Sequence, residues 1–323
     1  MKKKSIALLL AICFMCVCFL SSCDQEIAIQ PPITDEQLRS MPLYALNTNR
    51  TACIHLPNMP QYYKPEDNVA GKITFVEEYK GTEIEYYGET FTINSFCYYN
   101  STDYLSSFYY PEEKIAMIRL NECGTLKYDS VTKEPLEFYY FGKNGYYEPY
   151  DISDSPIEKE DVRARCELFV EDVLNDKYEK GIDLDNYELE MGPFLAGEHY
   201  FKYSFNGVLI HTIRFRLSSN GNVVEWTCHP VPSKDVISRI PNISKEQLEE
   251  LVISTCTEQY AKMGESVVAS FPEGEAVLPH VILIYNAPLG GYMIQIQGRI
   301  VLEYSNGVKE NKQFVFAMPL INE

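Results

Sequence analysis

Residues that could act as nucleophiles, bases or metal ligands are few in this chain, and they are scattered. The five histidines are His55, His199, His211, His229 and His280, and none lies three or four residues from another. A zinc site would therefore need ligands from distant segments. The nucleophile-elbow, zinc-helix and phosphate-loop patterns are also absent. We expect no catalytic residue, no metal site and no cofactor.

Two short segments place a thiol close to an imidazole, which is the combination used by cysteine nucleophiles. Cys228 and His229 are adjacent, so an extended chain puts them on opposite faces of one strand. Cys53 and His55 would share a face, but they lie in a proline-containing stretch. His211 falls on the apolar face of an expected strand, where we predict a hydrogen-bonded core histidine. Nucleophilic catalysis is not expected at any of them.

The acidic residues give no specific motif. Asp183-Leu184-Asp185-Asn186 looks like the start of a calcium loop, but the central glycine is missing and Phe194 occupies the position of the bidentate glutamate. A hydrated loop between a helix and a strand is the better interpretation. A carboxylate pair for glycoside hydrolysis needs no local motif, so a surface hydrolase remains an alternative.

The most informative cysteine is Cys23. Lysines at positions 2–4 precede an apolar run from Ile6 to Leu20, and two serines then lead into Cys23. Basic residues, an apolar core and a small-residue exit are typical of a secretory signal peptide over residues 1–22. The run is shorter than the roughly 20 apolar residues of a membrane-spanning helix.

The segment Leu20-Ser21-Ser22-Cys23 resembles the lipobox of bacterial lipoproteins. This resemblance implies that the Cys23 thiol receives diacylglycerol after export. The protein would then be attached to the outer face of the cell membrane, or to the outer membrane of a two-membrane cell. Lipid provides affinity because each buried methylene contributes about 0.8 kcal/mol. The alternatives are an ordinary signal peptide with an incidental cysteine and an uncleaved anchor.

Charge restricts the possible partners. The full chain carries a net charge of −18, and loss of the three signal lysines leaves the mature part near −21. Nucleic acid is not expected as a partner, because its binding depends on Lys and Arg. An anionic membrane face is also unfavourable. The expected partners are the membrane, through lipid on Cys23, and an envelope protein or glycan.

Six cysteines follow Cys23, and they are too dispersed for a small disulfide scaffold. Cys166 and Cys256 fall on the apolar faces of expected helices, so we predict buried thiols there. Cys97 with Cys123 is the most plausible disulfide, because both lie in a strand-rich stretch of an exported chain.

The pattern along the chain predicts an α+β protein. Residues 23–65 contain several prolines and read as a tether running into irregular structure, with one short helix after Thr34 that Pro42 should end. Residues 66–150 read as strands. Of the 25 tyrosines, 16 fall between Tyr62 and Tyr150, including four adjacent pairs: Tyr98-Tyr99, Tyr109-Tyr110, Tyr139-Tyr140 and Tyr146-Tyr147.

Residues 151–235 and 236–323 form two similar units. Each opens with capping-box spacing, at Ser155 and at Ser244, followed by an amphipathic helix. Strands and Gly turns follow, and the two Ser-Asn-Gly triplets lie 86 residues apart. This spacing predicts two repeated modules of a helix and about four antiparallel strands. The segment Ile33–Leu38 looks like a truncated third copy of the second helix start.

The segment Tyr200–Trp226, with its Asn206-Gly207 and Ser219-Asn220-Gly221 turns, resembles the PepSY and YcdB/YcdC-type modules of bacterial surface proteins. A fainter similarity extends over Tyr285–Phe316. The resemblance is architectural and implies non-catalytic roles in inhibition, binding or envelope regulation. No functional residue is carried over from it.

These features lead us to expect a non-enzymatic surface lipoprotein that binds or scaffolds another envelope component. Paired tyrosines put one ring on each side of a strand, so one side could pack in a core while the other meets a partner. A glycan- or solute-binding lipoprotein is the first alternative, and a surface hydrolase is the second.

Overall fold

The computed structural model describes residues 27, 30–45, 73–86, 89–100, 114–120, 124–129, 135–140 and 158–320, except 177, 196, 219, 220, 222, 263, 273–279 and 287–290. The signal segment, Cys23, Cys53, His55 and Cys123 lie outside these residues. Within them, no helix has the length and apolar character needed to cross a membrane.

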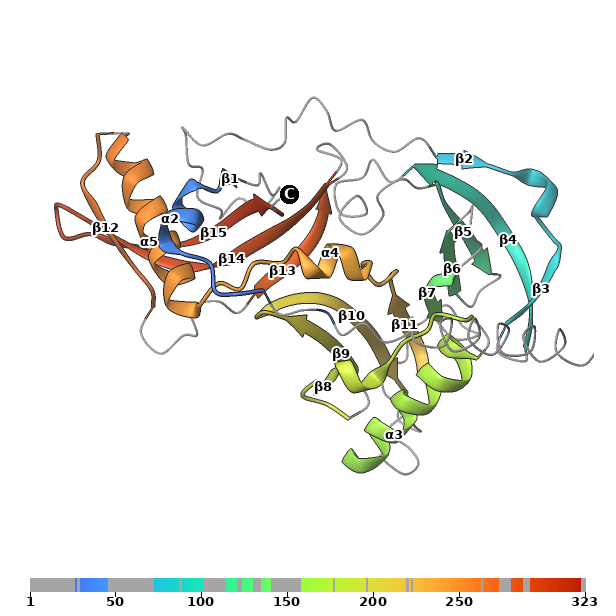
Figure 1. Cartoon of the computed structure of the whole chain (residues 1–323). Helices are drawn as coiled ribbons and strands as arrows, with labels where there is room; N and C mark the ends of the chain where they lie inside the picture. Colours follow the sequence, from blue (N-terminus) through green and yellow to red (C-terminus); the bar gives the residue numbers. More distant parts are fainter. Residues whose placement is uncertain are drawn as a thin grey trace, which may run out of the picture.

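The protein is α+β, and most of its strands join one large sheet (Figure 1). The described α-helices are α2 (Asp35–Ser40), α3 (Lys159–Phe169), α4 (Lys234–Ser238) and α5 (Lys245–Lys262). A π-helical segment, η3 (Val170–Asn175), continues α3, and η2 (Glu77–Tyr79) and η4 (Leu184–Asn186) are short 3₁₀ helices. The strands are β1 (Tyr44–Ala45), β2 (Ile73–Phe75), β3 (Glu83–Tyr86), β4 (Glu89–Asn100), β5 (Lys114–Leu120), β6 (Gly124–Asp129), β7 (Pro135–Tyr140), β8 (Glu188–Met191), β9 (Glu198–Phe205), β10 (Val208–Leu217), β11 (Val223–Cys228), β12 (Val267–Ser270), β13 (His280–Asn286), β14 (Gly291–Tyr304) and β15 (Lys309–Pro319).

The main path of the sheet runs in the order β1-β15-β14-β13-β10-β11-β7-β6-β5-β4-β2. All pairs along it are antiparallel except β10 with β13, which meet in parallel at Leu209 and Ile282. The tyrosine-rich strands continue the sheet of the following unit, because β7 pairs with β11. Strand β9 pairs with β10 through a turn at Asn206 and Gly207, whose φ angles of 50° and 75° suit a two-residue hairpin.

Two large hydrophobic clusters each contain one long helix, and a small third cluster consists of Ile284, Met293 and Ala317. The first cluster, here called the α3 core, buries Val162, Cys166 and Phe169 of α3 against β9, β10 and β11. Phe169 meets Phe215 edge-on, with 5.5 Å between ring centroids, and Trp226 is fully buried beside them. Large aromatic side chains therefore fix this helix to its sheet.

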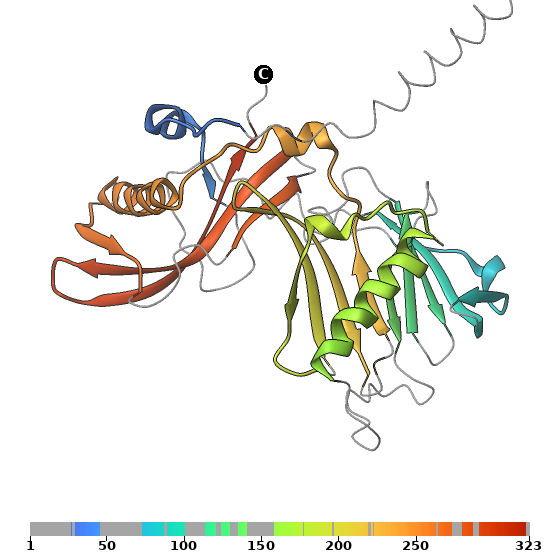
Figure 2. The same cartoon turned by 60° about the horizontal axis from the view of Figure 1, so that its bottom comes forward.

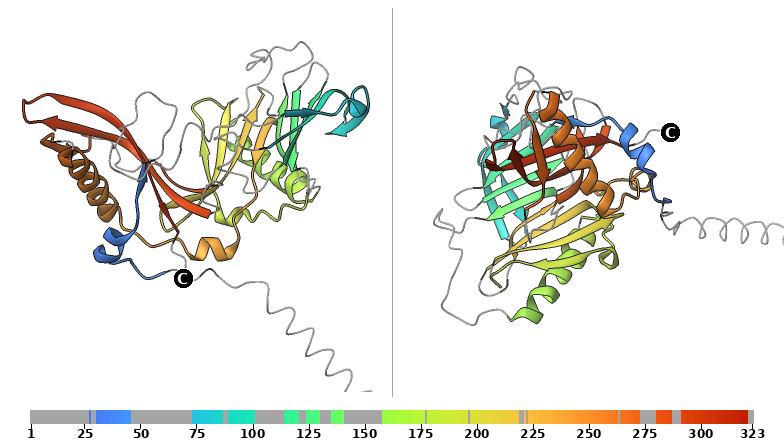
Figure 3. Two further views of the ribbon diagram at one scale, coloured as in Figure 1. Left: turned by 90° about the horizontal axis from the view of Figure 1, so that it is seen from above. Right: turned by 90° about the vertical axis from the view of Figure 1, so that its left-hand side faces the viewer.

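The second cluster, here called the α5 core, places α5 against β13, β14 and β15. Its helix stripe contains Leu248, Val252 and Cys256, and the facing strands supply side chains such as Ile296 and Phe314. Helices α3 and α5 lie on the same side of the continuous sheet (Figures 2 and 3). No described helix covers the opposite side, here called the helix-free face.

The helix starts follow local sequence rules with one exception. The α2 capping box is present, with Thr34 and Gln37 bonding reciprocally, and the helix ends at Ser40 ahead of Pro42. At α5, the Gln247 backbone donates to Ser244 Oγ at 3.2 Å, as the second capping box predicts. Helix α3 differs, because it begins at Lys159 with no side-chain cap.

The N-terminal segment packs on the second half of the chain. A parallel bridge joins Pro32 to Asn242, and β1 pairs with β15 through Tyr44 and Ala317. The side chain of Leu38 is buried in the α5 core. Residues 30–45, which the sequence assigns to a tether and irregular segment, are thus part of the folded body.

We predict that Phe215→Ala lowers the free energy of unfolding by about 3–5 kcal/mol, because it removes a fully buried ring and leaves a cavity. Urea unfolding followed by the fluorescence of Trp226 measures this, since it is the only tryptophan and lies in the same core. Leu168→Ala, on the exposed side of α3, is the control and should change the value little. Equal effects of both substitutions would contradict the assigned core.

Candidate functional site

Two adjacent rows of polar residues cross the helix-free face. One row follows the strand register from Lys127 on β6 to Glu190 on β8, passing through Glu137, Thr227, Arg214 and Tyr200. The neighbouring row contains Glu225, Arg216 and Glu198, which face one another in the same register. We call the whole set, with Lys202, the polar band: Lys127, Glu137, Glu190, Glu198, Tyr200, Lys202, Arg214, Arg216, Glu225 and Thr227.

The band exists because strand side chains alternate between faces. Phe215 lies between Arg214 and Arg216, and Trp226 lies between Glu225 and Thr227; both aromatic side chains are fully buried in the α3 core. The polar residues on either side of Phe215 and Trp226 must therefore point to the helix-free face.

The centre of the band is a closed ring of ion pairs. Arg214 contacts Glu225 through Nη2, and its Nη1 lies 3.5 Å from Glu198 Oε1. Arg216 contacts the same Glu198 oxygen through Nη2, and its Nε lies 3.5 Å from Glu225 Oε2. Each arginine thus bridges both carboxylates. Tyr200 donates its hydroxyl hydrogen to Glu198, which adds a third donor.

The two central glutamates have opposite environments. Burial raises the pKa of Glu225, although Arg214 and Arg216 counteract it. The hydrogen bond from Tyr200 lowers the pKa of Glu198, and the two arginines act in the same direction. Glu225 is only 1% exposed, and its Oε2 has no hydrogen-bond partner among the described residues. One strong acceptor at the centre of the band is therefore incompletely satisfied.

The outer parts of the band are also paired. Lys127 Nζ lies 2.9 Å from Glu137, and Lys202 contacts Glu190. The band contains four basic side chains and four carboxylates, so its formal charge is zero, whereas the chain carries −18. It presents many donors and acceptors without the charge of the surrounding surface.

This arrangement suits binding better than catalysis. Carboxyl groups whose pKa values move apart are a feature of acid–base pairs. A catalytic acid must also reach its substrate, and the Glu225 side chain is almost fully buried and held by two guanidinium groups. Charged and polar side chains in a fixed lattice can instead recognise polar groups through several directional hydrogen bonds.

The prediction for His211 is confirmed, because both of its ring nitrogens are occupied. Tyr187 Oη lies 2.9 Å from Nδ1, and the His229 carbonyl oxygen lies 2.7 Å from Nε2. The carbonyl can only accept, so Nε2 carries the proton and Nδ1 accepts from Tyr187. Burial lowers the pKa of His211 to about 4. It is a neutral core histidine.

The other sequence candidates do not converge on a site. Asp183 accepts from the Asp185 backbone at 3.1 Å and so caps the η4 turn between α3 and β8, which agrees with a loop. Cys166 and Cys256 are buried thiols, and burial raises the pKa of each to about 12. Cys97 is buried in β4, and its pairing with Cys123 stays a prediction because Cys123 lies outside the described residues.

The remaining predictions, on the tyrosine pairs and on metal ligands, can be compared with the structure only over the described residues. Tyr109-Tyr110 and Tyr146-Tyr147 lie outside it, while Tyr98-Tyr99 and Tyr139-Tyr140 are placed only by strand register. Tyr139 is opposite Glu225, next to the polar band. Over the described part of the chain, no group of three or more His, Cys, Asp or Glu side chains could hold a metal ion.

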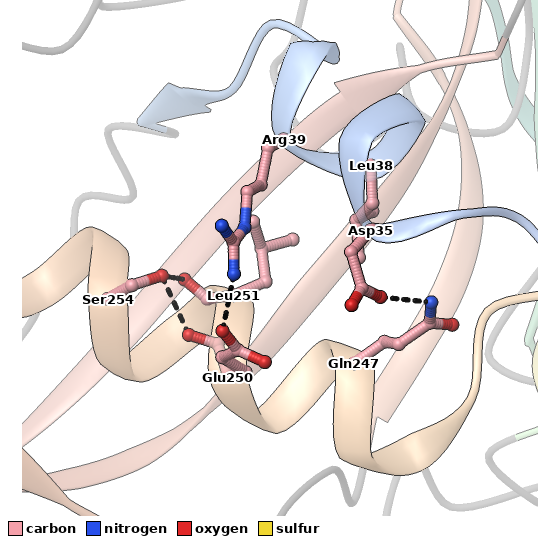
Figure 4. Close-up of a pocket in the computed structure, with 7 residues that line it drawn as sticks. All are labelled: Asp35, Leu38, Arg39, Gln247, Glu250, Leu251 and Ser254. Carbon is pink, nitrogen blue, oxygen red and sulfur yellow. Dashed lines mark hydrogen bonds and ion pairs between the residues drawn. The ribbon is translucent and has the colours of Figure 1, made fainter.

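A groove lies between α2 and α5 (Figure 4). Its sides are joined by an ion pair of 2.7 Å between Arg39 and Glu250 and by a hydrogen bond from Gln247 to Asp35. It encloses only about 20 Å³, whereas sites that enclose a small molecule hold roughly 300–1,000 Å³. We interpret it as the seam between two packed helices.

Comparisons of the chain with family models, with curated proteins and with solved structures find no match.

The two glutamates should contribute to stability with opposite pH dependence. A raised folded-state pKa favours folding at low pH, so the wild type should lose stability relative to Glu225→Gln as the pH rises above 4.5. A lowered pKa favours folding at higher pH, so the wild type should lose stability relative to Glu198→Gln as the pH falls below 4.5. Urea unfolding of the three proteins from pH 3 to pH 8 measures both differences. Slopes of the same sign would contradict the assigned environments.

Proposed function

We propose that this protein is a non-enzymatic, lipid-anchored surface protein whose polar band binds another component of the cell envelope. The observation that carries the proposal is the band itself, a neutral lattice of charged side chains on the helix-free face of the sheet. A buried ion-pair network contributes little net stability compared with apolar packing. Its position in the middle of the large sheet therefore favours a role in recognition.

The chemistry of the band favours a partner that offers hydrogen bonds without a large net charge. A strongly anionic partner would be repelled by the acidic chain, and a strongly cationic one would compete with Arg214 and Arg216 for their glutamates. An envelope protein with a polar, near-neutral surface meets these conditions.

A glycan is the second candidate, because neutral sugars also present dense hydroxyl groups. Tyr200 and Thr227 add hydroxyls to the carboxylates and guanidinium groups of the band. In the strand register, Tyr139 lies opposite Glu225 at the edge of the band.

We also propose that residues 151–235 and 236–323 are two copies of one module. Helices α3 and α5 begin at Lys159 and Lys245, and β11 and β15 begin at Val223 and Lys309, so both pairs are 86 residues apart. Gly221 and Gly307 keep the same offset, with φ angles of 80° and 79°. This common spacing supports duplication, and we propose a PepSY-like architecture for each copy. The copies differ at one edge, where β8 pairs with β9 but β12 pairs with β14.

The lipid anchor makes a direct prediction. Replacing Cys23 with serine removes the thiol that would receive diacylglycerol, so Cys23→Ser should move the protein from the membrane fraction to the soluble fraction and abolish fatty-acid labelling. Cell fractionation and metabolic labelling measure this, and Cys53→Ser is the control that should change neither. A Cys23→Ser protein that remains on membranes as before would reject the anchor.

The role of the band is tested by a double substitution that keeps its charge balanced. Arg214→Gln with Glu198→Gln should weaken binding of the purified protein to isolated cell envelopes by roughly tenfold, which corresponds to about 1.4 kcal/mol. The matched control is Arg163→Gln with Glu167→Gln, an Arg–Glu pair of 2.7 Å on the opposite, α3 side of the sheet. It should leave binding unchanged.

Treatment of the envelopes distinguishes the two candidate partners. Protease should remove the binding if the partner is a protein, and periodate should remove it if the partner is a glycan, because periodate cleaves vicinal diols. If both double variants bind as tightly as the wild type, the band is not the binding surface.

A further inference from the structure

We propose that the region around α4 is the face of the protein that lies against the lipid surface. This inference rests on the proposed lipidation of Cys23. It comes from the place where the anchored end of the chain joins the folded body.

The first described residue after Cys23 already belongs to that body. Ile27 is half-buried and packs against the α5 core. Three residues lie between it and Cys23, and the four Cα–Cα steps from Cys23 to Ile27 span at most about 14 Å in an extended chain. Whatever path the intervening residues take, the body cannot be farther from the lipidated cysteine than this. A free tether over residues 23–65 would reach about ten times as far.

The next contacts fix the direction of approach. The Gln30 side chain donates to the carbonyl oxygen of Ser238, the last residue of α4, at 3.0 Å. The Asn242 side chain donates to the Gln30 carbonyl oxygen at 3.3 Å, and the Ile33 backbone donates to the Asn242 carbonyl oxygen at 3.0 Å. The anchored chain therefore enters the body directly beside α4.

Further contacts keep this segment in place. Gln247 at the start of α5 donates to the Ile33 carbonyl oxygen at 2.9 Å, and Arg39 pairs with Glu250. Leu38 is 4% exposed within the α5 core, and β1 adds its backbone hydrogen bonds to β15. Apolar burial and main-chain pairing act together, so the segment behaves as a clasp. We use "clasp" below for residues 30–45.

The α4 region has the composition that such a location needs. Its charged residues are Lys234, Asp235 and Arg239, with Asp235 and Arg239 paired at 3.3 Å. The region is therefore slightly basic in a strongly acidic chain, which avoids repulsion by anionic headgroups. Val231, just before α4, is a 39% exposed apolar side chain. The partner of this face is a lipid surface, because the proposed lipid on Cys23 would hold the face close to it.

This orientation also places the polar band. The Asn206 side chain donates to the Ile240 carbonyl oxygen at 3.1 Å, so the turn before β10 lies beside α4. Arg214 follows eight residues later in the chain, a distance of roughly 25 Å at the rise of a strand. The band thus lies well away from the anchored end, where an envelope partner can reach it.

The test measures the distance of chosen residues from the bilayer. The lipidated full-length product is reconstituted in vesicles of phosphatidylcholine and phosphatidylglycerol that contain lipids with a nitroxide on the headgroup. A fluorescent non-canonical residue is placed at position 231, beside α4, or at one of two exposed control positions, 190 and 308. We expect severalfold stronger quenching at 231 than at 190 or 308.

A second variant tests the clasp. Leu38→Asp should reduce the quenching at 231 toward the control values while the protein stays on the vesicles, because the free tether then becomes long. Arg163→Gln, on the exposed side of α3, should not change it. Circular dichroism establishes that Leu38→Asp remains folded.

The outcomes separate this inference from the anchor on which it rests. A product that does not float with vesicles overturns lipidation itself. A product that floats but shows equal quenching at 231, 190 and 308 overturns the proposed orientation and leaves the anchor intact. Strong quenching at 231 that survives Leu38→Asp overturns the role of the clasp.

Discussion

The fold depends on the alternation of side chains along β10, the strand shared by both halves. Val208 and Ile210 at its start belong to the α5 core, while Ile213, Phe215 and Leu217 belong to the α3 core. The register of β10 with β9 shifts between Leu209 and His211, and this irregularity keeps apolar residues on the helix side on both sides of it. The same strand pairs with β9, β11 and β13. The constraint that builds both cores also forces Arg214 and Arg216 onto the helix-free face.

The alternation along β10 determines where the polar band lies, but stability alone does not require its side chains to be charged. Ordinary apolar or uncharged side chains would satisfy the alternation, and the ring of two arginines and two glutamates adds the desolvation of four charges. Arg214 and Arg216 each contact both Glu198 and Glu225, so the position of each glutamate depends on the two arginines. A surface of this kind is rigid before any partner arrives, because every charged side chain is already held by its neighbours. Such preorganisation reduces the entropy lost on binding.

Local features of the fold could be predicted from the sequence, and non-local ones could not. The α2 and α5 capping boxes, the Asn206-Gly207 turn and the core position of His211 each depend on a few neighbouring residues. The pairing of β7 with β11 joins segments that no local pattern connects. The polar residues alternate visibly with apolar ones in Val208–Leu217, but only the strand register brings Glu198 and Glu225 to the same two arginines. The packing of residues 30–45 on the folded body could not be predicted from the sequence, because prolines at both ends of a short helix are typical of a tether.

The contacts between the two ends of the chain constrain when the protein can finish folding. Tyr44 in β1 pairs with Ala317 in β15, a residue far from it in the sequence. Strand β1 therefore has no pairing partner until β15 is present. Contacts of such long sequence separation form late, because closing a long loop costs entropy before it is compensated. Completion of the body is thus coupled to the presence of β15, and a chain that stopped before it would leave β1 unpaired.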